Sequence, residues 1–316
     1  MKRICCYSLS IPEGGRSDLL TQIITSVDSL RSYNKEVGII LFAYGDLPMN
    51  LMRSLQMLGV RIWLLPPYSA RLSQICPIGW QFLCQYPLLH KFLNFAEISS
   101  LDPDQVLLLD CDTYFQGDVA RLFDQYSSPD LVACEEVGSR RSRQGYHRSM
   151  IDEDNLIQIG SMVGINPAQP FNLGVVLLNN GIWKKLAGLS TLHISYAWRF
   201  MVWMAANPSE PDSEYGEGVG VDDLRQHWSY LAPGDQFLAL PYPSKNRWIL
   251  DEVTLWMTLG HLPNTTFQDF NHTDVIQSVE FTEKERIRTW VVCHYFSQNL
   301  NLISNWVRNK ADFVST

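Results

Sequence analysis

The chain has 316 residues and a formal net charge of -8 at pH 7. Hydrophobic residues make up 46% of it and charged residues 18%, which is enough apolar material for a sizeable buried core and excludes disorder as the default state. Nucleic-acid affinity is carried mostly by clustered Lys and Arg, so the acidic balance predicts no nucleic-acid partner.

The sequence shows no targeting or membrane segment. The first apolar run, Ile4–Leu9, is too short for a signal peptide and is expected to be a strand. The best candidate for a spanning helix, Ile194–Ala206, falls short of roughly 18 apolar residues and carries Arg199. Seven cysteines without a C-x-x-C spacing fit free thiols in a reducing compartment. We therefore expect a cytoplasmic protein without a transmembrane segment, and the sequence does not predict its oligomeric state.

The first 110 residues alternate between buried-strand and amphipathic-helix patterns. The expected strands are Ile4–Leu9, Val37–Tyr44, Val60–Leu65 and Gln105–Leu109, and the expected helices are Asp18–Tyr33, Pro48–Leu58 and Leu88–Ile98. Repeated β-α units predict an α/β fold with an open, mostly parallel twisted sheet flanked by helices. Ligands of such sheets bind outside the carboxyl ends of the strands, and Asp110 lies at such an end.

Beyond Asp110 the alternation loosens. The expected strands are Asp130–Cys134, Phe171–Asn180 and Thr289–His294, and the expected helices are Gly181–Ala187, Ile194–Ala206, Leu250–Leu259 and Leu300–Asn309. Two polar segments are expected to be loops: Glu135–Pro170, with Arg140, Arg141 and Arg143, and Asn207–Asp223. Because no linker composition divides the chain, we expect a single domain over residues 1–316.

A carboxylate pair is the first candidate functional motif. In Val106-Leu-Leu-Leu-Asp-Cys-Asp-Thr-Tyr-Phe, strand alternation would place Asp110 and Asp112 on one face and turn Cys111 away. Two converging carboxylates repel each other unless a cation lies between them, and Mn²⁺ or Mg²⁺ is the natural guest. Such an ion would neutralise the charge of a departing nucleoside diphosphate. The ordinary alternative is a helix-capping Asp110 followed by an aspartate in a turn.

The same motif also resembles the nucleophile strand of haloacid-dehalogenase-type phosphatases. There the first aspartate is phosphorylated and the second acts as a general acid. Such an enzyme needs a later lysine and an acidic pair, for which Lys245 and Asp222-Asp223 are available. However, about 105 residues precede the motif here, whereas that chemistry normally lies at the first strand of its domain.

Five short sequence words resemble those of GT-A-fold glycosyltransferases, most closely the glycogenin and bacterial galactosyltransferase group. In chain order they are His90-Lys-Phe-Leu, Leu107-Leu-Leu-Asp-Cys-Asp-Thr-Tyr, Phe171-Asn-Leu-Gly-Val-Val-Leu-Leu-Asn, Asp251-Glu and Cys293-His294. The resemblance covers about residues 4–296 and implies metal-dependent transfer of a hexose from a UDP- or GDP-sugar to a hydroxyl acceptor, with retention of configuration. It also implies a Rossmann-like nucleotide-sugar-binding half of about residues 1–115 and an acceptor-side half of about residues 116–316.

The resemblance assigns roles to individual residues. Lys91 matches a basic residue that contacts the donor, and His294 matches a third protein ligand to the metal. Asn172 and Gly174 match a strand that lies against the donor sugar. Each has an ordinary alternative: a solvated lysine, a structural histidine, an asparagine satisfied by backbone, and a glycine at a bulge or in tight packing.

Asp251 and Glu252 stand where the family has an Asp-Gln pair near the reacting sugar carbon. One of these acids would orient the acceptor or stabilise an oxocarbenium-like centre, whereas the alternative is two acids that interact with a helix dipole. The nucleoside is expected near Ser8–Ile11. The nucleotide-sugar site is thus expected to include Ser8, Leu9, Lys91, Asp110, Cys111, Asp112 and Gly174.

The chain also departs from the family pattern. Leu173 replaces the usual small residue after the asparagine, and the segment after His294 lacks the family's glycine and lysine. These departures leave open a third interpretation, in which the chain keeps the fold as a non-catalytic sugar-, nucleotide- or partner-binding protein. The acceptor, whether a glycan, a lipid-linked sugar, a small molecule or a protein, is not predicted.

Overall fold

A computed structural model describes residues 2–10, 17–77, 79–84, 89–136, 151–206, 249–277 and 289–295. Several features singled out in the sequence lie outside these ranges: Ile11, the arginines at 140, 141 and 143, the segment 207–223, Lys245 and the helix expected at 300–309.

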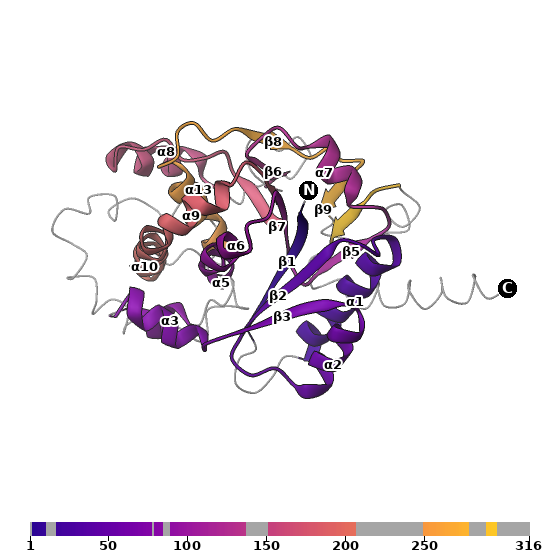
Figure 1. Ribbon diagram of the computed structural model, residues 1–316. Helices are drawn as coiled ribbons and strands as arrows, with labels where there is room; N and C mark the ends of the chain where they lie inside the picture. Colours follow the sequence, from indigo (N-terminus) through magenta and orange to yellow (C-terminus); the bar gives the residue numbers. More distant parts are fainter. Residues whose placement is uncertain are drawn as a thin grey trace.

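Seven strands form the central sheet in the order β3-β2-β1-β4-β7-β6-β8 (Figure 1). They are β1 (Arg3–Ser10), β2 (Gly38–Tyr44), β3 (Val60–Leu65), β4 (Gln105–Leu109), β6 (Leu131–Glu135), β7 (Phe171–Leu178) and β8 (Phe267–Asp269). Strands β1 to β4 are parallel to one another, β6 is parallel to β8, and β7 runs antiparallel to both β4 and β6. The predicted mostly parallel sheet is confirmed.

Helices cover both faces of this sheet. Figure 1 shows α1 and α2 on one side and α5, α6, α9, α10 and α13 on the other. The helices are α1 (Ser17–Tyr33), α2 (Met49–Met57), α3 (Tyr68–Ile75), α4 (Trp80–Leu83), α5 (His90–Leu93), α6 (Phe95–Leu101), α7 (Ala120–Gln125), α8 (Glu153–Met162), α9 (Ile182–Gly188), α10 (Ser190–Ala206) and α13 (Leu250–Leu259). The molecule is therefore a three-layer α/β structure.

Alternation along the strands supplies two hydrophobic cores. In β1, Cys5 and Tyr7 pack toward α1 and α2, whereas Ile4 and Cys6 pack toward the helices of the opposite layer. Both faces of the sheet are covered, so its central strands need apolar side chains at successive positions rather than at every second one. This explains the unbroken apolar runs in the sequence.

Some boundaries differ from the sequence-based expectations. The helix expected over Leu88–Ile98 consists of two short helices, α5 and α6, and the strand expected over Thr289–His294 is limited to Val292–His294. The segment expected to be a loop contains α8, which begins after Asp152, whose side chain accepts a hydrogen bond from the Asn155 backbone N–H at 3.1 Å. That capping aspartate and the apolar spacing after it are the sequence features that indicate this helix.

A second, three-stranded sheet completes the site. It has the order β5-β10-β9, with β5 (Thr113–Phe115), β9 (Val275–Gln277) and β10 (Val292–His294). Strand β10 is antiparallel to β5 and pairs His294 with Thr113. The backbone N–H of Tyr295 also donates to the Asp112 carbonyl at 3.0 Å. A segment about 180 residues later in the chain is thereby fixed beside the D-x-D motif.

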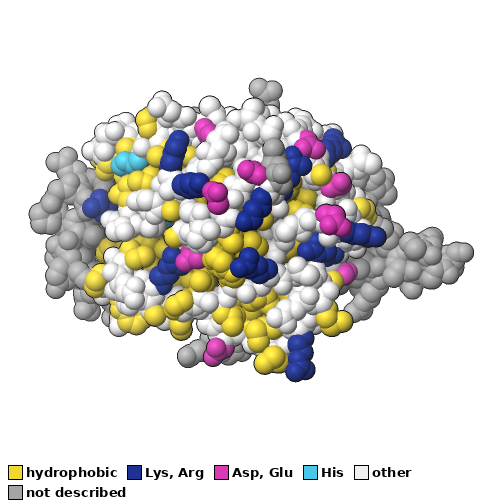
Figure 2. Space-filling model, in the orientation of Figure 1, with side chains coloured by type: hydrophobic (Ala, Val, Ile, Leu, Met, Phe, Trp, Pro, Cys, Tyr) yellow, Lys and Arg dark blue, Asp and Glu magenta, His cyan; other side chains and the backbone are white. Residues whose placement is uncertain are grey.

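The described residues include no candidate for a membrane-spanning helix, and they expose some large apolar side chains. None of the helices in the ranges given above is long and apolar enough to cross a membrane. Among the large apolar side chains of the described residues, the most exposed are those of Met57, Leu64 and Met49. On the face in Figure 2, apolar side chains are interspersed with Lys and Arg.

Asn179 anchors the end of β7 that lies away from Asp110. Its Nδ2 donates to the carbonyls of Tyr126 at 2.8 Å and Pro129 at 2.7 Å, and its Oδ1 accepts from Gln105 Nε2 at 2.8 Å. Because Asn179→Ala leaves these buried groups without partners, we expect it to lower the free energy of unfolding by about 2–4 kcal/mol. Urea denaturation measures this, and a loss below about 0.5 kcal/mol would contradict the anchoring role.

Candidate metal centre

The two aspartates lie around a turn between β4 and β5. Asp110 follows the last residue of β4, and Cys111 and Asp112 form the turn. The two carboxylates converge as expected, but a turn and not strand alternation brings them together, because residues 110–112 are not in a strand. The capping alternative is wrong, since the next element is β5. Thr113 Oγ1 donates to the Asp110 carbonyl at 2.9 Å and closes the turn.

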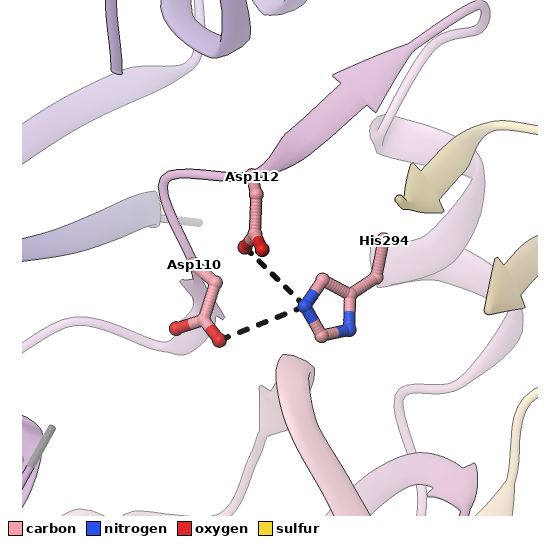
Figure 3. Close-up of side chains that lie close together, drawn as sticks. All are labelled: Asp110, Asp112 and His294. Carbon is pink, nitrogen blue, oxygen red and sulfur yellow. Dashed lines mark ion pairs between the residues drawn. The ribbon is translucent and has the colours of Figure 1, made fainter. Parts of the chain in front are cut away.

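Asp110, Asp112 and His294 point toward one another (Figure 3). His294 Nε2 lies 3.3 Å from Asp112 Oδ1 and 3.8 Å from Asp110 Oδ2. One ligand atom from each residue lies within 4.8 Å of the other two. The strand pairing of β10 with β5 and the turn after β4 are what bring these three side chains together.

This geometry fits a divalent ion. An octahedral ion about 2.1 Å from each ligand separates neighbouring ligand atoms by about 3 Å and opposite ones by about 4 Å. The three side chains offer two hard carboxylate oxygens and one imidazole nitrogen, a set suited to Mn²⁺ or Mg²⁺. In the part of the chain that the structure describes, they are the one group of three or more His, Cys, Asp and Glu side chains arranged in this way.

Lys91 is a partly buried cation beside the carboxylates. It lies on α5, forms an ion pair with Asp110 Oδ1, and its Nζ is 3.9 Å from Asp251 Oδ2. Burial lowers the pKa of Lys91, but the nearby charges of Asp110 and Asp251 outweigh burial and hold the pKa above its ordinary value. Lys91 is therefore charged and is not a solvated lysine on a helix surface.

Asp251 and Glu252 begin α13 and face different neighbours. Asp251 faces Lys91, and burial raises the pKa of Asp251 to about 6, with the charge of Lys91 opposing the rise. Glu252 Oε1 instead accepts hydrogen bonds from Asn172 Nδ2 at 3.0 Å and from the Leu173 backbone N–H at 3.3 Å. Of the two acids, Asp251 borders the metal centre and Glu252 lies behind it.

Asn172 and Gly174 hold the ring of His294. Asn172 Oδ1 lies 2.9 Å from His294 Nδ1 and also accepts from the Gly174 backbone N–H at 2.8 Å. A Cβ at position 174 would overlap the imidazole ring. The glycine therefore makes room for the histidine, which is the tight-packing alternative to a close approach by a ligand.

Glu136 belongs to the site but was not recognised in the sequence. It follows β6, is only 2% exposed, and its Oε2 accepts from Asn172 Nδ2 at 3.3 Å. Burial raises the pKa of Glu136 to about 7. Like Asp110, Glu136 is an acid at the carboxyl end of a strand, which is the sequence pattern that indicates such a site. The polar residues that follow it favour a loop and obscure this pattern.

The expected nucleoside residues lie at the end of β1, next to β4. Ser8 Oγ accepts a hydrogen bond from Asn94 Nδ2, and the Ser8 carbonyl lies 3.9 Å from Cys111 Sγ. Cys111 thus points toward the edge where the nucleoside is expected. Leu9 is buried in the core between the sheet and α1, so its side chain does not face this edge.

No protein-family model and no curated protein sequence matches the chain. Similar solved structures include mouse xyloside xylosyltransferase 1 (11% identity, TM-score 0.49, 93% of this chain and 97% of that chain) and the glycosyltransferase GlyE of Streptococcus pneumoniae TIGR4 (15%, 0.48, 97% and 60%). The galactosyltransferase LgtC, solved with donor and acceptor sugar analogues, covers 96% of this chain and 95% of its own at 12% identity and a TM-score of 0.50. This chain has the GT-A glycosyltransferase fold. The Asp110–Asp112 turn follows β4, the fourth strand in the chain. In haloacid-dehalogenase-type phosphatases the corresponding motif normally follows the first strand of the domain.

Replacing Gly174 with alanine tests the packing of the histidine. The added methyl group would displace the His294 ring, so we expect Gly174→Ala to weaken Mn²⁺ binding at least about tenfold. Isothermal titration calorimetry measures the affinity. Gly188→Ala is the matched control and should bind as the wild type does, because apart from its own stretch of helix no atom lies within 4 Å of the added Cβ. Unchanged affinity in Gly174→Ala would refute the packing argument.

Proton competition at His294 predicts a pH dependence of metal binding. Burial lowers the pKa of His294, but Asp112 and Asp110 outweigh burial and hold the pKa above its ordinary value of 6.5. A protonated imidazole cannot bind metal, so Mn²⁺ affinity should fall up to about tenfold per pH unit as pH drops through that raised pKa. Calorimetry at several pH values checks this, and His294→Ala should bind more weakly with a shallower dependence. An identical slope in both proteins would contradict the assignment.

Proposed function

We propose that the chain is a metal-dependent glycosyltransferase that moves a hexose from a UDP- or GDP-sugar to a hydroxyl acceptor, with retention of configuration. The observation that carries this proposal is the convergence of Asp110, Asp112 and His294 at the carboxyl edge of a GT-A sheet. A bound Mn²⁺ or Mg²⁺ would supply Lewis-acid neutralisation of the leaving diphosphate. Retention rests on the sequence resemblance.

The chain's own charges complement a nucleoside diphosphate. Lys91 places a desolvated positive charge next to Asp110, where it would bind a phosphate oxygen. The end of β1, at Ser8, lies beside the end of β4 because the two strands are parallel neighbours. This supports a nucleoside site in residues 1–115, with the acceptor bound by residues 116–316, in one domain.

Asp251 is our candidate for stabilising positive charge at the reacting sugar carbon. It is buried at the start of α13, on the metal side, and Lys91 holds its carboxylate. With a pKa of about 6, most of it is ionised at pH 7. A fixed negative charge in a buried site stabilises an oxocarbenium-like centre far more than the same charge does in water.

The partners and location follow the same proposal. LgtC was solved with donor and acceptor sugar analogues, which favours a sugar hydroxyl as the acceptor here. We place the protein in the cytoplasm on the basis of its seven cysteines without C-x-x-C spacing.

Nucleotide-dependent stabilisation is the direct test. We expect either UDP or GDP, but not both equally, to raise the Tm only when Mn²⁺ is present. The carboxylates of Asp110 and Asp112 would repel a diphosphate unless a cation held by them offset their charge. Binding at 100 times Kd stabilises by about 2.7 kcal/mol. Thermal-shift assays with UDP, GDP, CDP, ADP and simple phosphomonoesters, each with and without Mn²⁺, measure this.

The controls separate the remaining functions. Asp110→Asn and Asp112→Asn should fold but lose the Mn²⁺-dependent shift and at least about 100-fold of donor hydrolysis. Full activity in both would refute the metal assignment. Burst release from a phosphomonoester with Mg²⁺ would favour the phosphatase, and nucleotide binding without turnover would favour a non-catalytic binding protein.

A further inference from the structure

A buried polar network lies behind His294, on the side away from Asp110 and Asp112. Its centre is Asn172, which is 4% exposed. Asn172 Oδ1 contacts His294 Nδ1 at 2.9 Å, and Nδ2 contacts Glu252 Oε1 at 3.0 Å and Glu136 Oε2 at 3.3 Å. The network thus links the candidate metal ligand to two acids from β6 and α13.

The network fixes where the protons lie. The Gly174 backbone N–H can only donate, and it donates to Asn172 Oδ1 at 2.8 Å, so this atom is the amide oxygen. The amide nitrogen then faces carboxyl oxygens, which accept from it. With an acceptor at 2.9 Å, His294 Nδ1 carries the ring proton. In the neutral ring, Nε2 is then left without a proton and can bind a metal ion placed between it and the two aspartates.

We propose that Asn172, held by Glu252 and Glu136, is a positioning residue that fixes the tautomer and orientation of the His294 ring. This inference rests on the proposed metal site, for which the ring supplies the nitrogen ligand. Partners of this kind typically change metal affinity 10- to 100-fold when they are removed.

Glu252 reaches the His294 ring through Asn172. Its Oε1 accepts from both Asn172 Nδ2 and the Leu173 N–H, and its side chain is buried. The neighbouring Glu136 faces the same amide, and the pKa values of both acids are raised by burial. The raised pKa values favour a proton on one of the two carboxyl groups over two like charges. A glutamine at position 252 would keep the accepting oxygen and donate its amide to Glu136.

The first experiment reads the tautomer without metal. In metal-free protein with ¹⁵N-labelled histidine at alkaline pH, ring ¹⁵N shifts should show His294 protonated at Nδ1, and Asn172→Ala should shift the proton toward Nε2. His294→Ala assigns the signal. Asn179→Ala removes a comparably buried asparagine at the other end of β7 and should leave the tautomer unchanged. An Nδ1–H tautomer that persists in Asn172→Ala would overturn the inference.

The second experiment compares two substitutions of one acid. Calorimetry should show Mn²⁺ affinity about 10- to 100-fold weaker in Glu252→Ala and within about threefold of the wild type in Glu252→Gln. If Glu252→Gln bound Mn²⁺ normally but lost transfer of the sugar, Glu252 would act on the substrate and the inference would fall. Equal affinity of Glu252→Ala and the wild type would also overturn it.

The two proposals fail in different ways. Wild-type protein that binds neither Mn²⁺ nor a nucleoside diphosphate refutes the proposed function, and the metal-free tautomer measurement still decides whether Asn172 positions the ring. Conversely, a normal nucleotide response with an Asn172-independent tautomer supports the transferase and refutes the positioning role.

Discussion

Electrostatic balance among buried and partly buried acids is the constraint on which the site depends. In the described part of the chain, the acids that converge at this edge of the sheet outnumber the cations that face them. The acids are Asp110, Asp112, Glu136, Asp251 and Glu252, and the cations are Lys91 and the His294 ring when protonated. Such a group is tolerated in a buried setting only if charge is paired, neutralised by protons or compensated by a further cation. Charge is paired at Lys91, and protonation neutralises charge at the two glutamates behind His294. The geometry of Asp110, Asp112 and His294 suits a further cation.

Strand direction produces this convergence. Because β7 runs against β4, the beginning of β7 meets the end of β4, and the Asp110 N–H donates to the Gly174 carbonyl at 2.9 Å. The same reversal returns β6 to the direction of β4, so Glu136 leaves the sheet at the same edge. One reversed strand therefore gathers residues that lie far apart in the sequence.

The sequence predicted the parts of the site that local rules control. Asp110 and Asp112 follow an apolar strand, and Lys91 and His294 were indicated by short words in a particular order. The sequence did not predict that Asp251 faces Lys91 whereas Glu252 faces Asn172. Successive positions on a helix turn by about 100°, and only tertiary packing decides which of them faces a ligand. Likewise, the fold class followed from the β-α alternation, but the direction of β7 depends on long-range pairing that no local pattern encodes.

The close approach of the His294 ring to Gly174 has a consequence for divergence of such chains. The imidazole fills the space that any side chain at position 174 would need, so the two positions cannot change independently. A descendant that lost the histidine would be released from the requirement for glycine, and larger residues could then accumulate on β7. A glycine retained at this place in the strand would therefore mark chains whose metal centre is still under selection. A bulky residue would mark chains that keep the fold but have lost the metal centre.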